Sequence, residues 1–187
     1  MLTLLIRFFI GPIVRLIWVK EVTGLENIPT KGSVIIAFNH QSYFDFICFI
    51  AVAPRNIYYL SAEKFFEKPL WRLLLKITGQ IPVARTSNDK RETHDIVHQY
   101  LDEGKMIGIF PEGTRANDNT TMLRAYPGVA RYTIEKRTPV IPVGIIGTFE
   151  VLPRSENFPK FKKIVRINAG KPIYFSEDKR WETNLFL

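Results

Sequence analysis

The chain is 187 residues long, a length that indicates one domain with a sizeable core. Lys and Arg number 26 against 18 Asp and Glu, so the formal net charge is +8 and anionic partners are favoured: nucleic acid, acidic lipid head groups or an acidic carrier protein. Nucleic acid is not an expected partner, because the sequence contains no helix-turn-helix, zinc-knuckle or RNP pattern and no basic tract with interleaved aromatics. The one cysteine, Cys48, has apolar neighbours and cannot form an intramolecular disulfide, which favours a buried, inert thiol in a reducing compartment.

The first nineteen residues are almost entirely apolar, but Arg7 and Arg15 interrupt the run. The segment does not match a signal peptide, because its charges lie inside the apolar run and no small-residue cleavage site follows. It is marginal for a spanning helix, which needs about 20 apolar residues with few charges. On a helix, its polar residues form one stripe that drifts by about 40° per step: Thr3, Arg7, Gly11 and Arg15. This pattern favours a helix in the membrane interface with its arginines facing lipid phosphates and a break at Pro12; the alternative is a helix packed on the protein's own core.

Beyond residue 20, apolar runs alternate with helical patterns. The apolar runs predict strands at residues 33–38, 56–61, 80–85, 105–110, 139–146 and 163–169. The segments between them predict helices near residues 43–53, 64–78, 88–103 and 127–137. Near-continuous apolar strands separated by helices indicate an α/β domain with a largely parallel central sheet flanked by helices. Ligands of such sheets gather at the carboxyl ends of the strands.

The stretch NHQSYFD, residues 39–45, follows the first predicted strand and places His40 five positions before Asp45. Ser42 and Asp45 have the S-x-x-D spacing of a helix-capping box, so Asp45 has a purely structural interpretation. His40 lies between a strand end and a helix start, where an acid of the first helical turn can reach the imidazole and fix its tautomer, which predicts a catalytic pair. The sequence contains no G-x-S-x-G nucleophile elbow, and Cys48 is badly placed. A histidine base would therefore activate a hydroxyl of the substrate for direct group transfer.

A second polar cluster, FPEGTR at residues 110–115, follows another predicted strand. Its proline and glycine set a tight turn that presents three polar side chains: Glu112, Thr114 and Arg115. A charged hairpin tip has the same composition and is the alternative. Two further cations end predicted strands, Lys64 in SAEKFF and Arg85 in GQIPVAR. Cations at neighbouring strand ends predict an anion site, because arginine suits bidentate phosphate contacts.

Four stretches, in this order, resemble the motif blocks of the glycerophospholipid acyltransferases. NHQSYFD matches the histidine–four residues–aspartate block, and GQIPVAR resembles the second block through Gly79 and Arg85. FPEGTR matches the third block, and VIPVGI matches the fourth with Pro142. The resemblance covers roughly residues 20–175 and is strongest to the 1-acyl-sn-glycerol-3-phosphate acyltransferases (lysophosphatidic acid acyltransferases). It implies the glycerolipid acyltransferase fold, with an N-terminal membrane-associating helix at residues 1–20 and an acyltransferase catalytic domain at residues 21–187.

The resemblance also implies a role for each motif residue. His40 is the expected general base on the free hydroxyl of 1-acyl-glycerol 3-phosphate, and Asp45 is expected to orient it. The hydroxyl is expected to attack the thioester of acyl-CoA or acyl carrier protein, giving phosphatidic acid. The residues expected to bind the acceptor, with the cations around its phosphate, are Lys64, Arg85, Glu112, Gly113, Thr114 and Arg115. No metal is implied, and no cofactor besides the acyl donor.

The expected partners are the phospholipid bilayer, a lysophospholipid acceptor and the acyl donor, with the protein peripheral or monotopic on the cytosolic face of the cell membrane. The same machinery would serve other acceptors: glycerol 3-phosphate, another lysophospholipid or a lyso-aminolipid. A non-enzymatic membrane-surface lipid-binding protein would account for the N-terminal helix and the charge, but not for four ordered motifs. The stretch HDIVH, from His94 to His98, resembles the H-E-x-x-H motif of zinc proteases. Asp95 would stand in place of the catalytic glutamate, but its side chain is too short to reach a zinc-bound water well. The pattern of the segment instead favours a solvated amphipathic helix.

Overall fold

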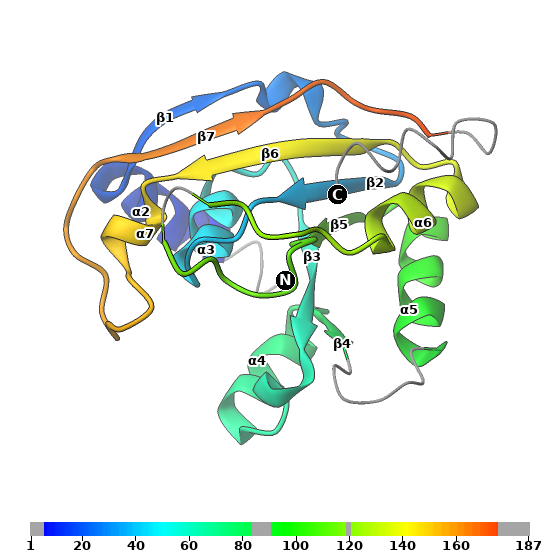
Figure 1. The fold of residues 1–187 in the computed structure, drawn as a ribbon, viewed down its shortest axis with the longest axis horizontal. Coiled ribbons are helices and arrows are strands. Elements are labelled where there is room, and N and C mark those ends of the chain that lie inside the picture. Colours follow the sequence, from blue (N-terminus) through cyan, green and yellow to red (C-terminus); the bar gives the residue numbers. More distant parts are fainter. Residues whose placement is uncertain (1–5, 84–90, 119–120, 176–187) are drawn as a thin grey trace.

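The computed structural model describes residues 6–83, 91–118 and 121–175, and within them the chain forms one seven-stranded sheet in the order β1-β7-β6-β2-β5-β3-β4 (Figure 1). Every neighbouring pair of strands is parallel except β6 and β7. This confirms the largely parallel sheet expected from the sequence. The strands are β1 Val19–Thr23, β2 Val34–Phe38, β3 Ile57–Ala62, β4 Ile81–Val83, β5 Met106–Ile109, β6 Val140–Ile146 and β7 Val165–Ala169.

The centre of the sheet is apolar on both faces, as a parallel sheet between two layers of helices requires. Ile35 and Ile36 are consecutive in β2, so their fully buried side chains point to opposite faces. Ile36 belongs to the core that includes Phe49 of α3, and Ile35 belongs to the core that includes Val97 of α5. Gly108 of β5 belongs to this packing, because a Cβ there would lie 2.5 Å from the ring of Tyr59.

Helices cover both faces of the sheet (Figure 1). The first core contains residues of α2 (Gly11–Ile17), α3 (Phe44–Val52) and α7 (Thr148–Val151). The second core contains residues of α5 (Arg91–Asp102) and α6 (Gly128–Lys136). The other helical elements are the π-helical turn Ile6–Ile10, the 3₁₀ turns Leu25–Asn27 and Glu63–Phe65, and α4 Pro69–Ile77. The architecture is therefore the expected α/β domain flanked by helices.

One expected helix differs from the structure, and two observed elements were not predicted. The helix predicted at 64–78 is a 3₁₀ turn followed by α4, because Pro69 starts the second helix and holds Lys68 in an extended conformation. β1 was not predicted, since VKEVT is a mostly exposed strand without an apolar run. α7 was not predicted because it is a four-residue helix. Residues 84–90, where one predicted strand ends and one predicted helix begins, lie outside the described residues.

The N-terminal segment is helical from Ile6 to Ile17, with a π-helical turn before Pro12 and an α-helix from Gly11 onward. The expected polar stripe is wrong at two positions. Gly11 is buried, because its missing side chain lets the helix pack against the backbone of Ala51 in α3. Arg7 also faces the protein and not the solvent side of the helix, and its guanidinium donates a hydrogen bond to the carbonyl of Ala53.

The opposite side of this segment is an exposed apolar face: Phe8, Phe9, Ile10, Ile13 and Leu16, each at least half exposed. Arg15 is exposed beside them. Among the described residues, no helix is both long enough and apolar enough to cross a bilayer. Membrane association of this segment stays a prediction.

Candidate active site

The strand order brings the sequence motifs to one edge of the sheet. β2 and β5 are parallel neighbours in register, with Ala37 beside Ile109, so His40 and the FPEGTR turn follow adjacent carboxyl ends. β3 is the next strand beyond β5, and Lys64 follows its end. β4 lies beyond β3, but Arg85 falls outside the described residues. The topology therefore places His40, the FPEGTR turn and Lys64 where ligands of parallel sheets bind.

His40 and Asp45 form the predicted pair. The Nδ1 atom of His40 lies 2.8 Å from Oδ2 of Asp45, whose side chain is fully buried. The same oxygen accepts the backbone N–H groups of Gln41 and Ser42, each at 2.9 Å. Because those two groups only donate, Oδ2 is an acceptor and Nδ1 is the protonated ring nitrogen. Nε2 of the 12% exposed imidazole is therefore the nitrogen able to accept a proton.

The structural and catalytic interpretations of Asp45 are compatible. Asp45 lies in the first turn of α3, and its bond to the N–H of Ser42 is one half of a capping box. The hydroxyl of Ser42 accepts the N–H of Phe44 at 3.1 Å, which satisfies another amide at the helix start. One carboxylate oxygen thus fixes both the start of α3 and the orientation of the imidazole.

Glu112 is a buried residue of the FPEGTR turn that connects this turn to the backbone of His40. Its carboxylate is buried and accepts the backbone N–H of His40 at 2.7 Å and that of Leu123 at 2.9 Å. A second hydrogen bond connects the same two segments, because the N–H of Ala116 donates to the carbonyl of His40 at 2.8 Å. Both oxygens of Glu112 are therefore engaged by backbone amides, and the side chain acts on the site by positioning His40.

Two further residues position His40, and the sequence reading gave them no role. The ring of Phe110 lies 4.1 Å from the imidazole, centroid to centroid, and covers one of its faces. The amide of Asn39 donates to the carbonyl of Ile145 at 2.8 Å and accepts the N–H of Ile145 at 2.7 Å, which locks the chain before His40 onto β6. In the sequence, Asn39 directly precedes His40 and Phe110 directly precedes PEGTR, and these positions were the only indication that the two residues belong to the site.

Arg115 and Lys64 contact an aromatic cluster formed by Tyr43 and Phe65. The guanidinium carbon of Arg115 lies 3.6 Å from the centroid of the Tyr43 ring, a cation–π contact. The ring of Phe65 meets Tyr43 edge-on at 5.5 Å, and Nζ of Lys64 lies 5.4 Å from the centroid of Phe65. Arg115 and Lys64 thus reach the same aromatic cluster from two different strand ends. This arrangement suits an anionic group of a substrate beside His40.

The FPEGTR turn depends on its glycine. Gly113 has a φ of 65°, a left-handed conformation that glycine adopts without strain, and its N–H bonds the carbonyl of Phe110 at 3.0 Å. A Cβ at this position would lie 3.1 Å from the ring of Tyr126. Thr114 is exposed on the turn. In this turn, the side chain of Glu112 points into the protein, whereas Thr114 and Arg115 stay near the surface.

Cys48 is not a candidate nucleophile in this structure. Its thiol is fully buried in the core beneath α3. Burial, with a further contribution from the nearby carboxylate of Asp45, raises the pKa of the thiol far above its ordinary value. The reactive thiolate is therefore not formed near neutral pH.

His94 and His98 hold two helices together. Nδ1 of His94 lies 2.7 Å from the hydroxyl of Tyr132, and Nε2 of His98 lies 2.9 Å from the carboxylate of Glu135; both partners belong to α6. Among the described residues, no group of three or more histidine, cysteine or acidic side chains is arranged to hold a metal ion.

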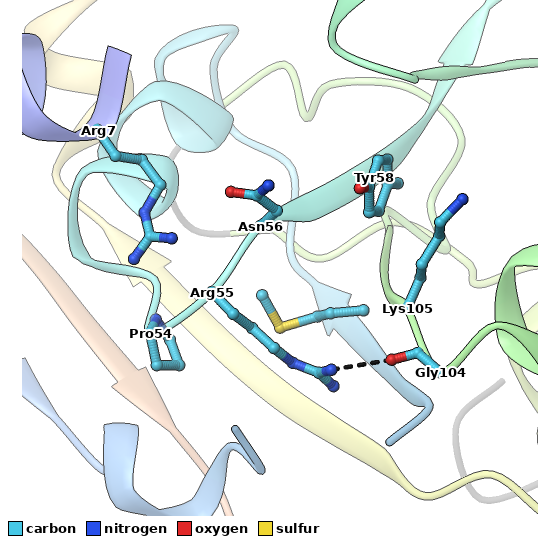
Figure 2. A pocket seen from close by; sticks show the side chains of 8 residues that line it. Arg7, Pro54, Arg55, Asn56, Tyr58, Gly104 and Lys105 are labelled. Carbon is cyan, nitrogen blue, oxygen red and sulfur yellow. Dashed lines mark hydrogen bonds between the residues drawn. The ribbon is translucent and has the colours of Figure 1, made fainter. Parts of the chain in front are cut away.

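A pocket of about 360 Å³ lies at the other end of the sheet, before β3 and β5 (Figure 2). Its two arginines are engaged with the protein's own backbone: Arg55 donates to the carbonyls of Gly104 and Gly32, and Arg7 to that of Ala53. Burial lowers the pKa of both guanidinium groups. None of the motif residues lines this pocket, so it is separate from the candidate active site.

The sequence is similar to those of known acyltransferases. A family model described as Acyltransferase matches residues 20–146. A 1-acyl-sn-glycerol-3-phosphate acyltransferase of Borreliella burgdorferi is 31% identical over 82% of this chain, and one of Bacillus subtilis is 26% identical over 82% of it. The chain spans 58% of the length of the first relative and 73% of the second.

The fold is similar to that of a solved structure. The crystal structure of a 1-acyl-sn-glycerophosphate acyltransferase of Thermotoga maritima superposes with a TM-score of 0.77. The match covers 98% of this chain and 75% of that one, at 23% sequence identity. The likeness supports the glycerolipid acyltransferase fold expected from the motifs.

Proposed function

Because the chain belongs to the acyltransferase family, we propose that it moves a fatty acyl group from a thioester donor to the free hydroxyl of 1-acyl-glycerol 3-phosphate. The product is phosphatidic acid. The observation that carries the proposal is the 2.8 Å contact between Nδ1 of His40 and Oδ2 of Asp45 at the carboxyl end of β2. The similarity to 1-acyl-sn-glycerol-3-phosphate acyltransferases supports the choice of acceptor.

His40 acts as the general base in this proposal. Nε2 takes the proton of the acceptor hydroxyl while the hydroxyl oxygen attacks the thioester carbonyl carbon. Asp45 keeps the proton on Nδ1 and stabilises the imidazolium that forms. Collapse of the tetrahedral intermediate breaks the carbon–sulfur bond, and the imidazolium returns the proton to the departing thiolate. No bond forms between the protein and the acyl group, which is consistent with the buried thiol of Cys48.

The phosphate of the acceptor is proposed to bind the cations that surround the aromatic cluster. The guanidinium carbon of Arg115 lies 3.6 Å from the centroid of the Tyr43 ring, and a guanidinium can bind phosphate through two N–H groups at once. Lys64 approaches from the end of β3, and Arg85 is proposed to join them. Glu112, Gly113 and Thr114 shape the acceptor site through the FPEGTR turn. No metal and no cofactor besides the acyl donor is needed for these steps.

The enzyme is proposed to work as a peripheral or monotopic protein on the cytosolic face of the membrane. The acceptor is anchored in the bilayer by its acyl chain, whereas acyl-CoA and acyl carrier protein are soluble donors. The active site must therefore lie at the boundary between the two phases. The exposed apolar face of the N-terminal segment supports this placement, because a wide apolar surface on a protein marks an interaction site.

A transfer assay with purified protein tests the proposal. The acceptors are 1-acyl-glycerol 3-phosphate, glycerol 3-phosphate and a lysolipid without phosphomonoester, each with acyl-CoA and with acyl carrier protein as donor. We expect the first acceptor to be preferred. Arg85→Ala and Arg115→Ala should each lower kcat/KM with it by about 10- to 150-fold, the value of a charge-assisted hydrogen bond. Equal losses with the acceptor that lacks the phosphomonoester would assign these arginines a structural role.

A further inference from the structure

The loop between α7 and β7, residues 153–164, presents aromatic and basic side chains together. Phe158 is 81% exposed and Phe161 is 80% exposed. Three lysines alternate with them and are also exposed: Lys160, Lys162 and Lys163. Within the loop, Glu156 pairs with Lys160 at 2.7 Å, so Arg154, Lys162 and Lys163 leave the loop with a net positive charge. Exposed phenylalanine is unfavourable in water, and this loop carries two phenylalanines that both remain largely exposed.

One end of this loop lies beside the candidate active site. The hydroxyl of Ser42, between His40 and Asp45, donates to the carbonyl of Leu152 at 2.7 Å. Arg154 donates to the side chain of Asn117 at 2.9 Å, just after the FPEGTR turn. Figure 1 shows the loop at the end of the molecule where β2 and β6 have their carboxyl ends. The loop therefore begins where substrate is proposed to bind.

The other end of the loop is attached to the N-terminal helix. Nε1 of Trp18, directly after α2, donates to the carbonyl of Lys160 at 2.8 Å. The Trp18 indole also stacks on Phe161, with centroids 5.7 Å apart. Trp18 thus joins the loop to the end of the helix that carries the exposed apolar residues Ile13 and Leu16.

A basic hollow lies at this junction. A pocket of about 530 Å³ runs between α2 and the start of β1, and three of its lining residues are the cations Arg15, Lys20 and Lys163. Leu16 of the exposed apolar face lines it as well, and Glu21 contributes one acidic side chain. Apolar residues next to converging cations match the chemistry of a phospholipid, whose phosphate lies directly above its hydrocarbon.

We propose that the 153–164 loop is a second membrane-binding element, which docks together with the N-terminal segment on an anionic phospholipid bilayer. Phe158 and Phe161 enter the boundary between head groups and hydrocarbon, while Lys162 and Lys163 contact lipid phosphates. Docking through both elements places the edge of the sheet that carries His40 against the bilayer. This inference rests on the proposed membrane location of the acceptor, and it goes beyond it by assigning the loop.

Vesicle sedimentation with the full chain tests the loop directly. The vesicles are phosphatidylcholine alone or an equal mixture with phosphatidylglycerol. Lys162→Gln with Lys163→Gln should lower partitioning onto the anionic vesicles by about 25-fold, since each lysine near an anionic surface contributes about fivefold. Their effect should shrink on the neutral vesicles and at high salt. Phe158→Ser with Phe161→Ser should lower partitioning onto both vesicles by about tenfold or more.

Matched controls carry the same changes at the opposite end of the sheet. Lys31→Gln with Lys171→Gln removes the same charge from exposed positions, and Tyr174→Ser removes a 70% exposed aromatic ring. These controls should partition like the unchanged protein. Loop variants that bind vesicles like the unchanged protein would overturn the proposal, and so would controls that lose as much as the loop variants.

Activity measurements separate this inference from the proposed function. Transfer to a detergent-dispersed acceptor should be unaltered in the loop variants, whereas transfer to an acceptor in anionic vesicles should fall with their binding. If the unchanged protein transferred no acyl group at all, the proposed function would fail while the vesicle result still decided the role of the loop. If loop variants kept vesicle binding and lost only the use of acyl carrier protein, the loop would be a carrier-docking surface and the membrane proposal would be wrong.

Discussion

Replacing Glu112 by glutamine should destabilise the protein and slow transfer with every acceptor. The glutamate uses both oxygens to accept backbone N–H groups of His40 and Leu123, at 2.7 and 2.9 Å. Glutamine can accept only one of these bonds, because its amide nitrogen would point at the other N–H. One buried N–H loses its partner and the remaining bond loses its charge, at a combined cost of about 2–4 kcal/mol. The midpoint of thermal unfolding should fall by about 5–15 °C for a chain of this size.

Thermal unfolding and steady-state kinetics together check this reasoning. Glu26→Gln makes the same chemical change at an exposed position and should leave both the unfolding midpoint and the activity unaltered. In Glu112→Gln, kcat/KM should fall by the same factor with phosphate-bearing and phosphate-free acceptors, because the damage is to the position of His40. An unchanged unfolding midpoint combined with a higher KM for a single acceptor would show that Glu112 contacts substrate, and would refute the positioning role.

The remaining predictions concern the aromatic cluster, the two histidines of α5 and the thiol of Cys48. Tyr43→Leu should raise KM for a phosphate-bearing acceptor by about 2- to 30-fold, because it removes the cation–π contact with Arg115. Tyr43→Phe keeps the ring and should not raise this KM. Equal effects of the two variants would contradict a role for the ring. His94→Ala with His98→Ala, or addition of a chelator, should leave turnover largely intact, and loss of activity on chelation would revive the zinc interpretation. Because burial raises the pKa of the Cys48 thiol, iodoacetamide should not label the native protein near neutral pH but should label it after unfolding; fast native labelling would disprove the burial.

Local patterns predicted the catalytic pair because its two members lie close together in the sequence. Only four residues lie between His40 and Asp45, and a strand followed at once by a helix leaves few ways to arrange them. The partners of His40 from the FPEGTR stretch are different. Phe110 and Glu112 reach it only because β2 and β5 are neighbours, and strand order is not written in either segment. The inward turn of Glu112 also depends on Leu123, far along the chain from His40.

The N-terminal segment shows a second limit of periodicity. The spacing of Arg7, Gly11 and Arg15 predicted a single polar stripe, but it could not say which side of the helix packs on the protein. Gly11 is small enough for close contact between α2 and α3, so it belongs to the packed side. Arg7 is compatible with that side because the end of α3 offers its guanidinium a carbonyl. The large apolar residues were left exposed, the reverse of the usual amphipathic helix.

The most direct test of the central claim is the rate of acyl transfer by His40→Ala. The variant should stay folded, since Asp45 Oδ2 keeps its bonds to the N–H groups of Gln41 and Ser42 and the start of α3 is preserved. Its unfolding midpoint should therefore lie close to that of the unchanged protein. Thiol release from acyl-CoA in the presence of 1-acyl-glycerol 3-phosphate should fall by about 10²–10⁴-fold, the usual contribution of a general base. A folded variant that retained near-full transfer would contradict the assignment of His40 as the catalytic base.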